Sequence, residues 1–155
     1  MSNSEIRRAI REAVRDGVTR ALGALGLLGI ALIHLLDLPG KFGETPYMAW
    51  LYVGLIVAAG VLAAALVLGG DRWIWQTAAG LSASVILGYV LSRTTGLPQA
   101  TDDIGNWGEP LGIASLFVEG AVVALGAGVL WTRRVAAPVR RLPRLVHPAE
   151  GLRAA

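Results

Sequence analysis

One carboxylate lies deep within an apolar segment of this chain and is the first residue that could do chemistry. Glu119 is the single charged residue between Leu111 and Trp131, and ionisable groups at membrane depth are costly and usually functional. Its helical face is mostly small and holds Gly112, Ser115, Val123 and Gly126. Small residues let a neighbouring helix approach closely, so we expect Glu119 to point into a bundle. There it would either carry a proton or cation, or act as a hydrogen-bonded packing residue.

A histidine and an aspartate form a second candidate site, in the first apolar segment. His34 and Asp37 are three residues apart and therefore lie on nearly the same face of a helix. The alternatives are a hydrogen-bonded interfacial histidine, a proton relay or substrate contact, and a metal or haem ligand. Zinc needs at least two further protein ligands, so metal binding stays unknown. The weak metal candidates are His34, Asp102, Asp103 and Glu119.

Arg93 and Tyr89 are polar residues at the end of the third apolar segment. Arg93 either extends to the membrane interface, captures an anionic substrate group, or forms an ion pair with Asp37, Glu44 or Glu109. We expect residues 93–110, which contain several turn-forming glycines and prolines, to fold as a cap over the mouth of a bundle. The predicted ligand or proton site consists of His34, Asp37, Tyr89, Arg93, Glu109 and Glu119.

Four long apolar segments must position these side chains. Hydrophobic residues make up 54% of the 155 residues and charged residues only 16%, against about 25% charged residues in soluble domains. Each segment can form a helix that crosses the hydrocarbon core, which takes about 20 residues. The sequence predicts an all-α, four-helix transmembrane bundle with an ordered loop between the third and fourth helices. The predicted spans are 21–38, 47–68, 73–92 and 111–131.

The basic residues predict the orientation of the bundle. Of the 14 lysines and arginines, only Lys41 and Arg93 lie on the side opposite the two termini. By the positive-inside rule, both termini are cytoplasmic in a multi-pass protein of the plasma (inner) membrane. The loop between the third and fourth helices then faces outward. The net charge of +3 is explained by this topology and by contact of the basic tails with anionic inner-leaflet lipids, and nucleic acid is not an expected partner.

Two terminal segments flank the transmembrane domain, which we place at residues 21–132. Residues 1–20 form a basic amphipathic helix, which either extends the first span, lies on anionic lipid, or docks on a partner. Residues 133–155 form a basic tail rich in proline, in which His147 has no second ligand nearby. Aromatic side chains should anchor the helices at the interfaces; those expected at the inner interface are Trp73, Trp75 and Trp131.

The sequence contains no recognisable catalytic motif. Cysteine is absent, which excludes disulfides, zinc–thiolate sites and iron–sulfur clusters, and no GxSxG, Walker A or HExxH pattern occurs. We therefore predict no catalytic residue and no cofactor. Our main hypothesis is a small non-enzymatic subunit or binding module with an outward-facing polar site for a small ligand, a cation or a partner membrane protein. The alternatives are a proton-coupled transporter or channel that works as a homo-oligomer with Glu119 as carrier, and, third, a membrane-embedded enzyme.

Part of the sequence is similar to a known family. The stretch from Tyr89 to Pro98, the run DIGNWGEP from Asp103 to Pro110, and Glu119 together resemble an uncharacterised family of small four-span integral membrane proteins of high-GC Gram-positive bacteria. The resemblance covers residues 20–132 and implies a four-span fold without an assigned activity. It marks four positions for testing: His34, Arg93, Glu109 and Glu119.

Overall fold

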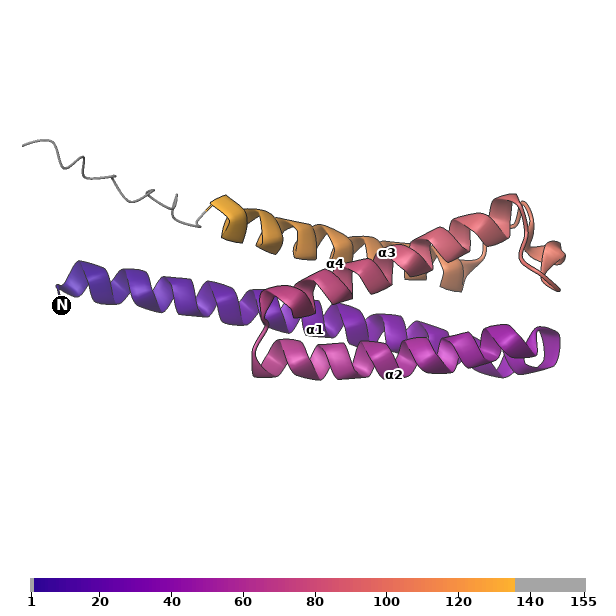
Figure 1. Cartoon of the computed structure of the whole chain (residues 1–155), viewed down its shortest axis with the longest axis horizontal. Coiled ribbons are helices and arrows are strands. Elements are labelled where there is room, and N and C mark those ends of the chain that lie inside the picture. The colour runs from indigo at the N-terminus through magenta and orange to yellow at the C-terminus, as the bar shows by residue number, and fades with distance from the viewer. Residues whose placement is uncertain (1, 136–155) are drawn as a thin grey trace, which may run out of the picture.

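A computed structural model describes residues 2–135, and within them the regular structure is helical. The helices are α1 (Asn3–Glu44), α2 (Pro46–Leu68), α3 (Arg72–Thr94) and α4 (Pro110–Val135), with the short 3-10 helix η1 (Thr101–Asp103) before α4 (Figure 1). All four α-helices are long and apolar enough to cross a membrane, which confirms the predicted all-α, four-helix architecture. The predicted tail from residue 136 onward, with His147, lies outside the described residues.

The first helix is longer than predicted. The sequence placed the end of the first span at residue 38 and left open whether residues 1–20 extend it, and α1 runs unbroken from Asn3 through Pro39 to Glu44. A proline removes only one backbone donor, and here it falls in the last two turns. The end of α1 is held by an ion pair from Lys41 to Glu44 at 2.9 Å and by the Thr45 amide, which donates to the Lys41 carbonyl at 2.9 Å. Pro39 is therefore accommodated inside the helix.

The N-terminal part of α1 projects beyond the other helices. Forty-two residues make a helix of about 63 Å, twice the roughly 30 Å of hydrocarbon. Side chains 3–16 are exposed, and the segment continues along the line of the bundle (Figure 1). It begins with a capping box between Ser2 and Glu5, and Arg8 pairs with Glu12 at 3.0 Å. Since the helix is continuous, this geometry favours an extension of the first span over a helix lying flat on lipid.

The helices are arranged in a ring in which one contact is weak. Helix α1 packs along both α2 and α4, and α3 packs along α4, whereas α2 and α3 contact each other much less. In Figure 1, α3 diverges from α2 with distance from the 69–71 connection. We call the end that carries Thr45 and residues 95–109 the loop end, and the opposite end, with residues 69–71, the termini end. The two helices separate toward the loop end.

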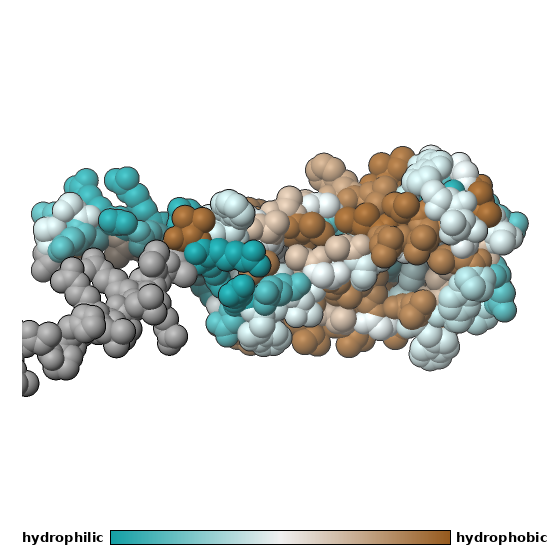
Figure 2. All heavy atoms as spheres, turned by 45° about the horizontal axis from the view of Figure 1, so that its top comes forward, coloured by the Kyte–Doolittle hydropathy of each residue, from teal (hydrophilic) through white to brown (hydrophobic). Residues whose placement is uncertain are grey.

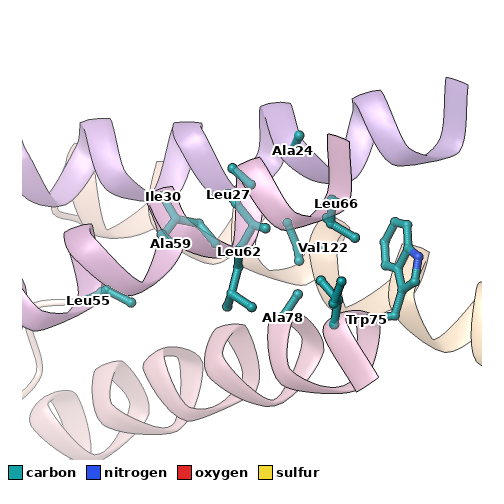
Figure 3. Close-up of a cluster of buried hydrophobic side chains, with 12 residues drawn as sticks. Ala24, Leu27, Ile30, Leu55, Ala59, Leu62, Leu66, Trp75, Ala78 and Val122 are labelled. Carbon is teal, nitrogen blue, oxygen red and sulfur yellow. The ribbon is translucent and has the colours of Figure 1, made fainter. Parts of the chain in front are cut away.

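The apolar core occupies the middle of the bundle and its termini end. It is built from twelve buried side chains (Figure 3): Ala24, Leu27, Ile30, Leu55, Ala59, Leu62, Ala63, Leu66, Ile74, Trp75, Ala78 and Val122. The expectation that Trp75 anchors at the interface is wrong. Its side chain is 1% exposed because Gly23 of α1 leaves room for the indole: a Cβ on Gly23 would lie 2.6 Å from Trp75 Cη2.

Two arginines hold the connection between α2 and α3. Gly70 has a φ of +65°, a conformation that favours glycine. Arg20 of α1 donates to the Gly69 carbonyl at 3.4 Å, and Arg133 of α4 donates to the Gly70 carbonyl at 3.1 Å. These carbonyls lack helical partners at the end of α2. The sequence explained the arginines by topology alone, but these two also join three helices.

The surface matches a membrane-spanning bundle. On the face shown in Figure 2, apolar side chains form a belt across the helices, with hydrophilic side chains gathered toward both ends. Large apolar side chains within the spans face outward, such as Leu68 (85% exposed) and Phe117 (79% exposed). Such groups would be unfavourable in water but favourable in lipid.

Candidate functional site

A cavity of about 400 Å³ lies at the loop end, between all four helices and the loop before α4. Its polar lining comes from α1, α2, α3, α4 and this loop, and includes His34, Asp37, Lys41, Tyr52, Tyr89, Ser92, Arg93, Asp103, Glu109 and Ser115. Apolar side chains complete the wall at greater depth. A cavity of this size, mostly apolar with a few convergent polar groups, is typical of a small-molecule site.

Arg93 is a buried charged residue of the cavity that forms two ion pairs. Its guanidinium is 5% exposed and contacts Asp103 Oδ1 and Glu109 Oε2, each at 2.5 Å. The two carboxylates are 25% and 33% exposed, so the cluster is partly shielded from water. Pairing with Glu109 was one of the alternatives from the sequence, whereas Asp103 was considered only as an oxygen ligand. Both partners compensate the charge of Arg93, which is therefore a poor candidate for holding an additional anion.

The Tyr89 side chain packs against Arg93 and its ion pairs. Its ring lies 4.9 Å from the Arg93 guanidinium carbon in a cation–π contact and meets the Trp107 ring edge-on at 6.1 Å. Gly112 of α4 permits the ring to pack closely, since a Cβ there would lie 2.5 Å from Tyr89 Cε2. Tyr89 therefore joins α3, α4 and the loop, in addition to lining the cavity.

His34 is buried, and its hydrogen bonding fixes which nitrogen can bind a ligand. The side chain is 5% exposed, and its Nδ1 lies 2.9 Å from the Ile30 carbonyl. A carbonyl only accepts hydrogen bonds, so Nδ1 carries the proton and the neutral ring presents Nε2 as an acceptor. The Tyr52 ring packs edge-on against it at 4.7 Å. The imidazole is thus held in place with one acceptor left for the cavity.

Asp37 differs from the other carboxylates around the cavity. Among residues 2–135, Asp103 and Glu109 pair with Arg93, and Glu44 pairs with Lys41, but no ion pair involves Asp37. It is half-buried and lines the cavity one helical turn from His34. The pair predicted from the sequence is therefore brought to the cavity, where the Asp37 carboxylate forms no ion pair within the described residues but lies near the Tyr52 hydroxyl and Lys41.

Glu119 lies next to the cavity but does not line it. Its side chain is fully buried, which confirms that it points into the bundle. Ser115 lines the cavity and donates to Glu119 Oε1 at 2.6 Å, while Oε2 has no partner. Ser82 and Trp75 of α3 also bury a polar atom without a partner. Glu119 therefore belongs to the packed interior and reaches the cavity only through Ser115.

Five of the six predicted site residues meet at the cavity: His34, Asp37, Tyr89, Arg93 and Glu109. Sequence reasoning did not assign Lys41, Tyr52, Ser84 or Ser92 to the site. Tyr52 and the two serines are ordinary residues of apolar spans and gave no signal of their own. Asp103 was named only as a weak metal candidate, and Ser115 only as a residue on the face of Glu119. Lys41 was noted only for its position outside the basic clusters.

A metal site finds no support in the described geometry. Within residues 2–135, no group of three histidine, cysteine or acidic side chains is close enough to hold an ion. Of the weak candidates, His34 and Asp103 line the cavity, with Asp103 paired to Arg93, whereas Asp102 is exposed on the loop and Glu119 is in the interior. The donor set of the cavity therefore suits an organic ligand better than a metal ion.

Two glycines leave the space that the cavity occupies. Gly54 of α2 and Gly88 of α3 both line it, and a Cβ built on either would meet no atom within 4 Å. The loop closes the end of this space: Tyr47 donates to the Pro98 carbonyl at 2.7 Å, and the Gly105 amide donates to the Arg93 carbonyl at 2.9 Å. The cavity is therefore capped at the loop end and least enclosed between α2 and α3.

Comparison with protein-family models, with curated proteins and with solved structures finds no match for this chain. The function is therefore argued from the cavity and from the membrane-spanning architecture.

Proposed function

We propose that this protein is a small integral membrane binding module whose site is the cavity at the loop end. The observation that carries the proposal is the convergence of polar side chains from all four helices on one cavity of about 400 Å³. Burying polar and charged groups at membrane depth costs free energy, so such groups usually have a function. The sequence offers no catalytic motif, so binding rather than catalysis is the simplest function for this arrangement.

The distribution of basic residues supports a cavity that opens toward the outside of the cell. The arginine-rich termini end is the cytoplasmic end by the positive-inside rule, and the loop end then faces outward. A ligand would reach the site from the outer leaflet or from the outer aqueous phase. The resemblance to four-span proteins of high-GC Gram-positive bacteria fits this topology and leaves the ligand open.

Native mass spectrometry of the full chain, extracted from its own membrane in mild detergent, tests the proposal. We expect a small molecule to be retained by the wild type and lost from Gly88→Leu, because leucine fills the cavity. Gly80→Leu is the matched control, since Gly80 also lies on α3 with open space beside it but does not line the cavity. A chain that carries no molecule, or an occupant that persists in Gly88→Leu, would contradict the proposal.

A second function, proton-coupled transport, is favoured by one specific observation. Glu119 is fully buried with one carboxyl oxygen unpartnered, and Ser115 links it to the cavity. A carboxyl group so placed is able to exchange a proton when a ligand binds or leaves. Since this cavity is capped at the loop end and the packed core fills the other end of the bundle, passage through the membrane would require an oligomer.

The carrier role of Glu119 has its own test in reconstituted vesicles. We expect Glu119→Gln to fold and to bind ligand while losing the pH dependence of uptake. Ser115→Ala removes the hydrogen bond and keeps the carboxyl group, so it should weaken the pH dependence without abolishing it. Unchanged pH dependence in Glu119→Gln would exclude the carrier role and leave the binding module as the function.

A further inference from the structure

The side of the cavity between α2 and α3 is open toward lipid. These two helices contact each other least, and the lining residues Leu51, Gly54 and Ser84 on that side are exposed. A ligand can therefore enter laterally, through the apolar belt of the bundle (Figure 2). Lateral entry favours a molecule that partitions into the membrane.

The two ends of the cavity differ in chemistry. The charged groups lie at the loop end, whereas Ile33, Leu55, Leu81 and Val85 line the deeper part. Leu55 is one turn deeper than Leu51 on α2, and Val85 is two turns deeper than Ser92 on α3. A ligand that matches both parts has a polar head and an apolar body.

The charge of the cavity favours a cationic head. Its lining contains three carboxylates and two cationic side chains. Both cations already have partners, because Lys41 pairs with Glu44, and Arg93 pairs with Asp103 and Glu109. Of the three carboxylates that line the cavity, Asp37 is the one that forms no ion pair within residues 2–135. A monocation would balance it, whereas an anion would have to compete with existing ion pairs.

Other groups near Asp37 can interact with a ligand that donates hydrogen bonds. His34 is only 5% exposed. It presents Nε2 as an acceptor, because its Nδ1 donates to the Ile30 carbonyl. The Tyr52 ring packs against His34, and aromatic rings attract cations through their faces. Two acceptors one helical turn apart, beside an aromatic ring, suit an ammonium group that carries N–H bonds, and such a group would compete for Asp37 with the nearby Tyr52 hydroxyl.

We propose that the cavity binds an amphipathic organic ammonium ion, with its N–H groups on Asp37 and His34 and its apolar body between α2 and α3. This inference rests on the proposed binding function and specifies the ligand class. Arg93 then acts as a positioning residue, which holds the loop over the site through Asp103 and Glu109. No group of three metal-binding side chains lies in the described chain, so an organic cation fits better than a metal ion.

The test compares three probes of equal length on the full chain in lipid nanodiscs at pH 7. The probes are 4-phenylbutylammonium, 4-phenylbutanol and 4-phenylbutyrate, with empty nanodiscs as the blank. We expect the ammonium ion to bind at least about tenfold tighter than the alcohol, because a hydrogen bond to a charged group is worth about that factor. The carboxylate should bind most weakly. Equal binding of ammonium and alcohol, or tightest binding of the carboxylate, would overturn the ligand class.

Variants identify the residue responsible for charge selection. Asp37→Asn should weaken ammonium binding by about tenfold or more and leave alcohol binding unchanged. The matched control Asp102→Asn removes an exposed loop carboxylate outside the cavity and should behave as wild type. His34→Phe keeps an aromatic ring without the acceptor and should also weaken ammonium binding, which keeps the test valid if Asp37→Asn does not fold. Unchanged ammonium binding in a folded Asp37→Asn would overturn the proposal.

The outcomes separate this inference from the proposed function. If the alcohol or the carboxylate binds the wild type as tightly as the ammonium ion does, and binding is lost in Gly88→Leu, the cavity is a ligand site but does not prefer a cation. If none of the three probes binds above empty nanodiscs, the binding function fails as well. Displacement of the ammonium probe by an equal concentration of Na⁺ or Ca²⁺ would assign the site to an inorganic cation and overturn the inference.

Discussion

The glycines of α1 that face other helices and the glycines beside the gap between α2 and α3 have opposite effects. Toward the termini end, glycines allow helices to touch: a Cβ on Gly23 would lie 2.6 Å from Trp75, and a Cβ on Gly26 would lie 2.5 Å from Val122. Toward the loop end, Gly54 and Gly88 face open space and line the cavity. Gly112 at the loop end also allows close packing, since a Cβ there would lie 2.5 Å from Tyr89, and Gly80 toward the termini end faces open space, so the effect of a glycine is not decided by the half in which it lies. A small residue permits contact, but the position of the neighbouring helix decides whether contact occurs.

The polar groups do differ between the two halves of the bundle. In the packed half, Ser82 and Glu119 are buried with oxygen atoms that lack partners. In the open half, Arg93 is compensated by two carboxylates, and Asp37 has access to the cavity. In the packed half, a proton on the Glu119 carboxyl group would reduce the cost of burying these unpartnered oxygen atoms. The open half holds groups that a ligand would satisfy.

The largest expected difference comes from placing leucine at one glycine of each half. Gly26→Leu should lower the free energy of unfolding by about 3 kcal/mol, because overpacking forces α1 and α4 apart. Gly88→Leu should change it by less than about 0.5 kcal/mol, because its side chain enters the cavity. Reversible unfolding in mixed micelles measures both. Similar losses in the two variants would show that the two sites do not differ in packing.

The second prediction concerns the ion pair that closes the open half. Arg93→Met should cost about 2 kcal/mol, at the low end for removing one partner of a buried charge pair, because both carboxylates are partly exposed. The same unfolding assay applies. Arg72→Met is the control, since Arg72 is exposed at the other end of α3. If the two variants are equally stable, the Arg93 cluster does not contribute to holding the loop.

A smaller substitution should change stability in opposite directions at these two kinds of glycine. Gly88→Ala should raise the free energy of unfolding by about 0.5 kcal/mol, since alanine restricts the unfolded chain and meets no neighbour. Gly23→Ala should lower it, because its Cβ would contact the buried Trp75 ring. Thermal unfolding of both variants in one detergent gives the sign. The same sign for both would contradict the assignment of the glycines to different roles.

The smallest effect is expected outside both halves, in the N-terminal extension of α1. Arg8→Ala breaks an ion pair whose side chains are 82% and 59% exposed, and such pairs contribute less than about 0.5 kcal/mol. Unfolding and probe binding should both remain as in the wild type. A loss of probe binding would mean that the extension acts on the cavity, which no described contact explains.

Much of the fold was predictable because hydropathy and length are local properties. Four apolar segments gave the four helices, and their ends differ from the predicted ends by only a few residues except in α1. There, Pro39 was expected to end the helix, but the contacts of Lys41 with Glu44 and Thr45 extend it. The burial of Glu119 followed from the small residues on its face. The family resemblance and the orientation in the membrane remain predictions.

The sequence by itself determined which side chains are unusual at membrane depth, because charge and hydropathy can be compared residue by residue. It selected His34, Asp37, Tyr89, Arg93 and Glu109, which the cavity brings together. Only the tertiary structure separated Glu119 from this group, added Lys41 and Tyr52, and brought Asp103 and Ser115 to the same cavity. It also decided that α2 and α3 diverge and leave a cavity. Helix rotation and spacing depend on contacts between segments far apart in the chain, which the local pattern of residues does not specify.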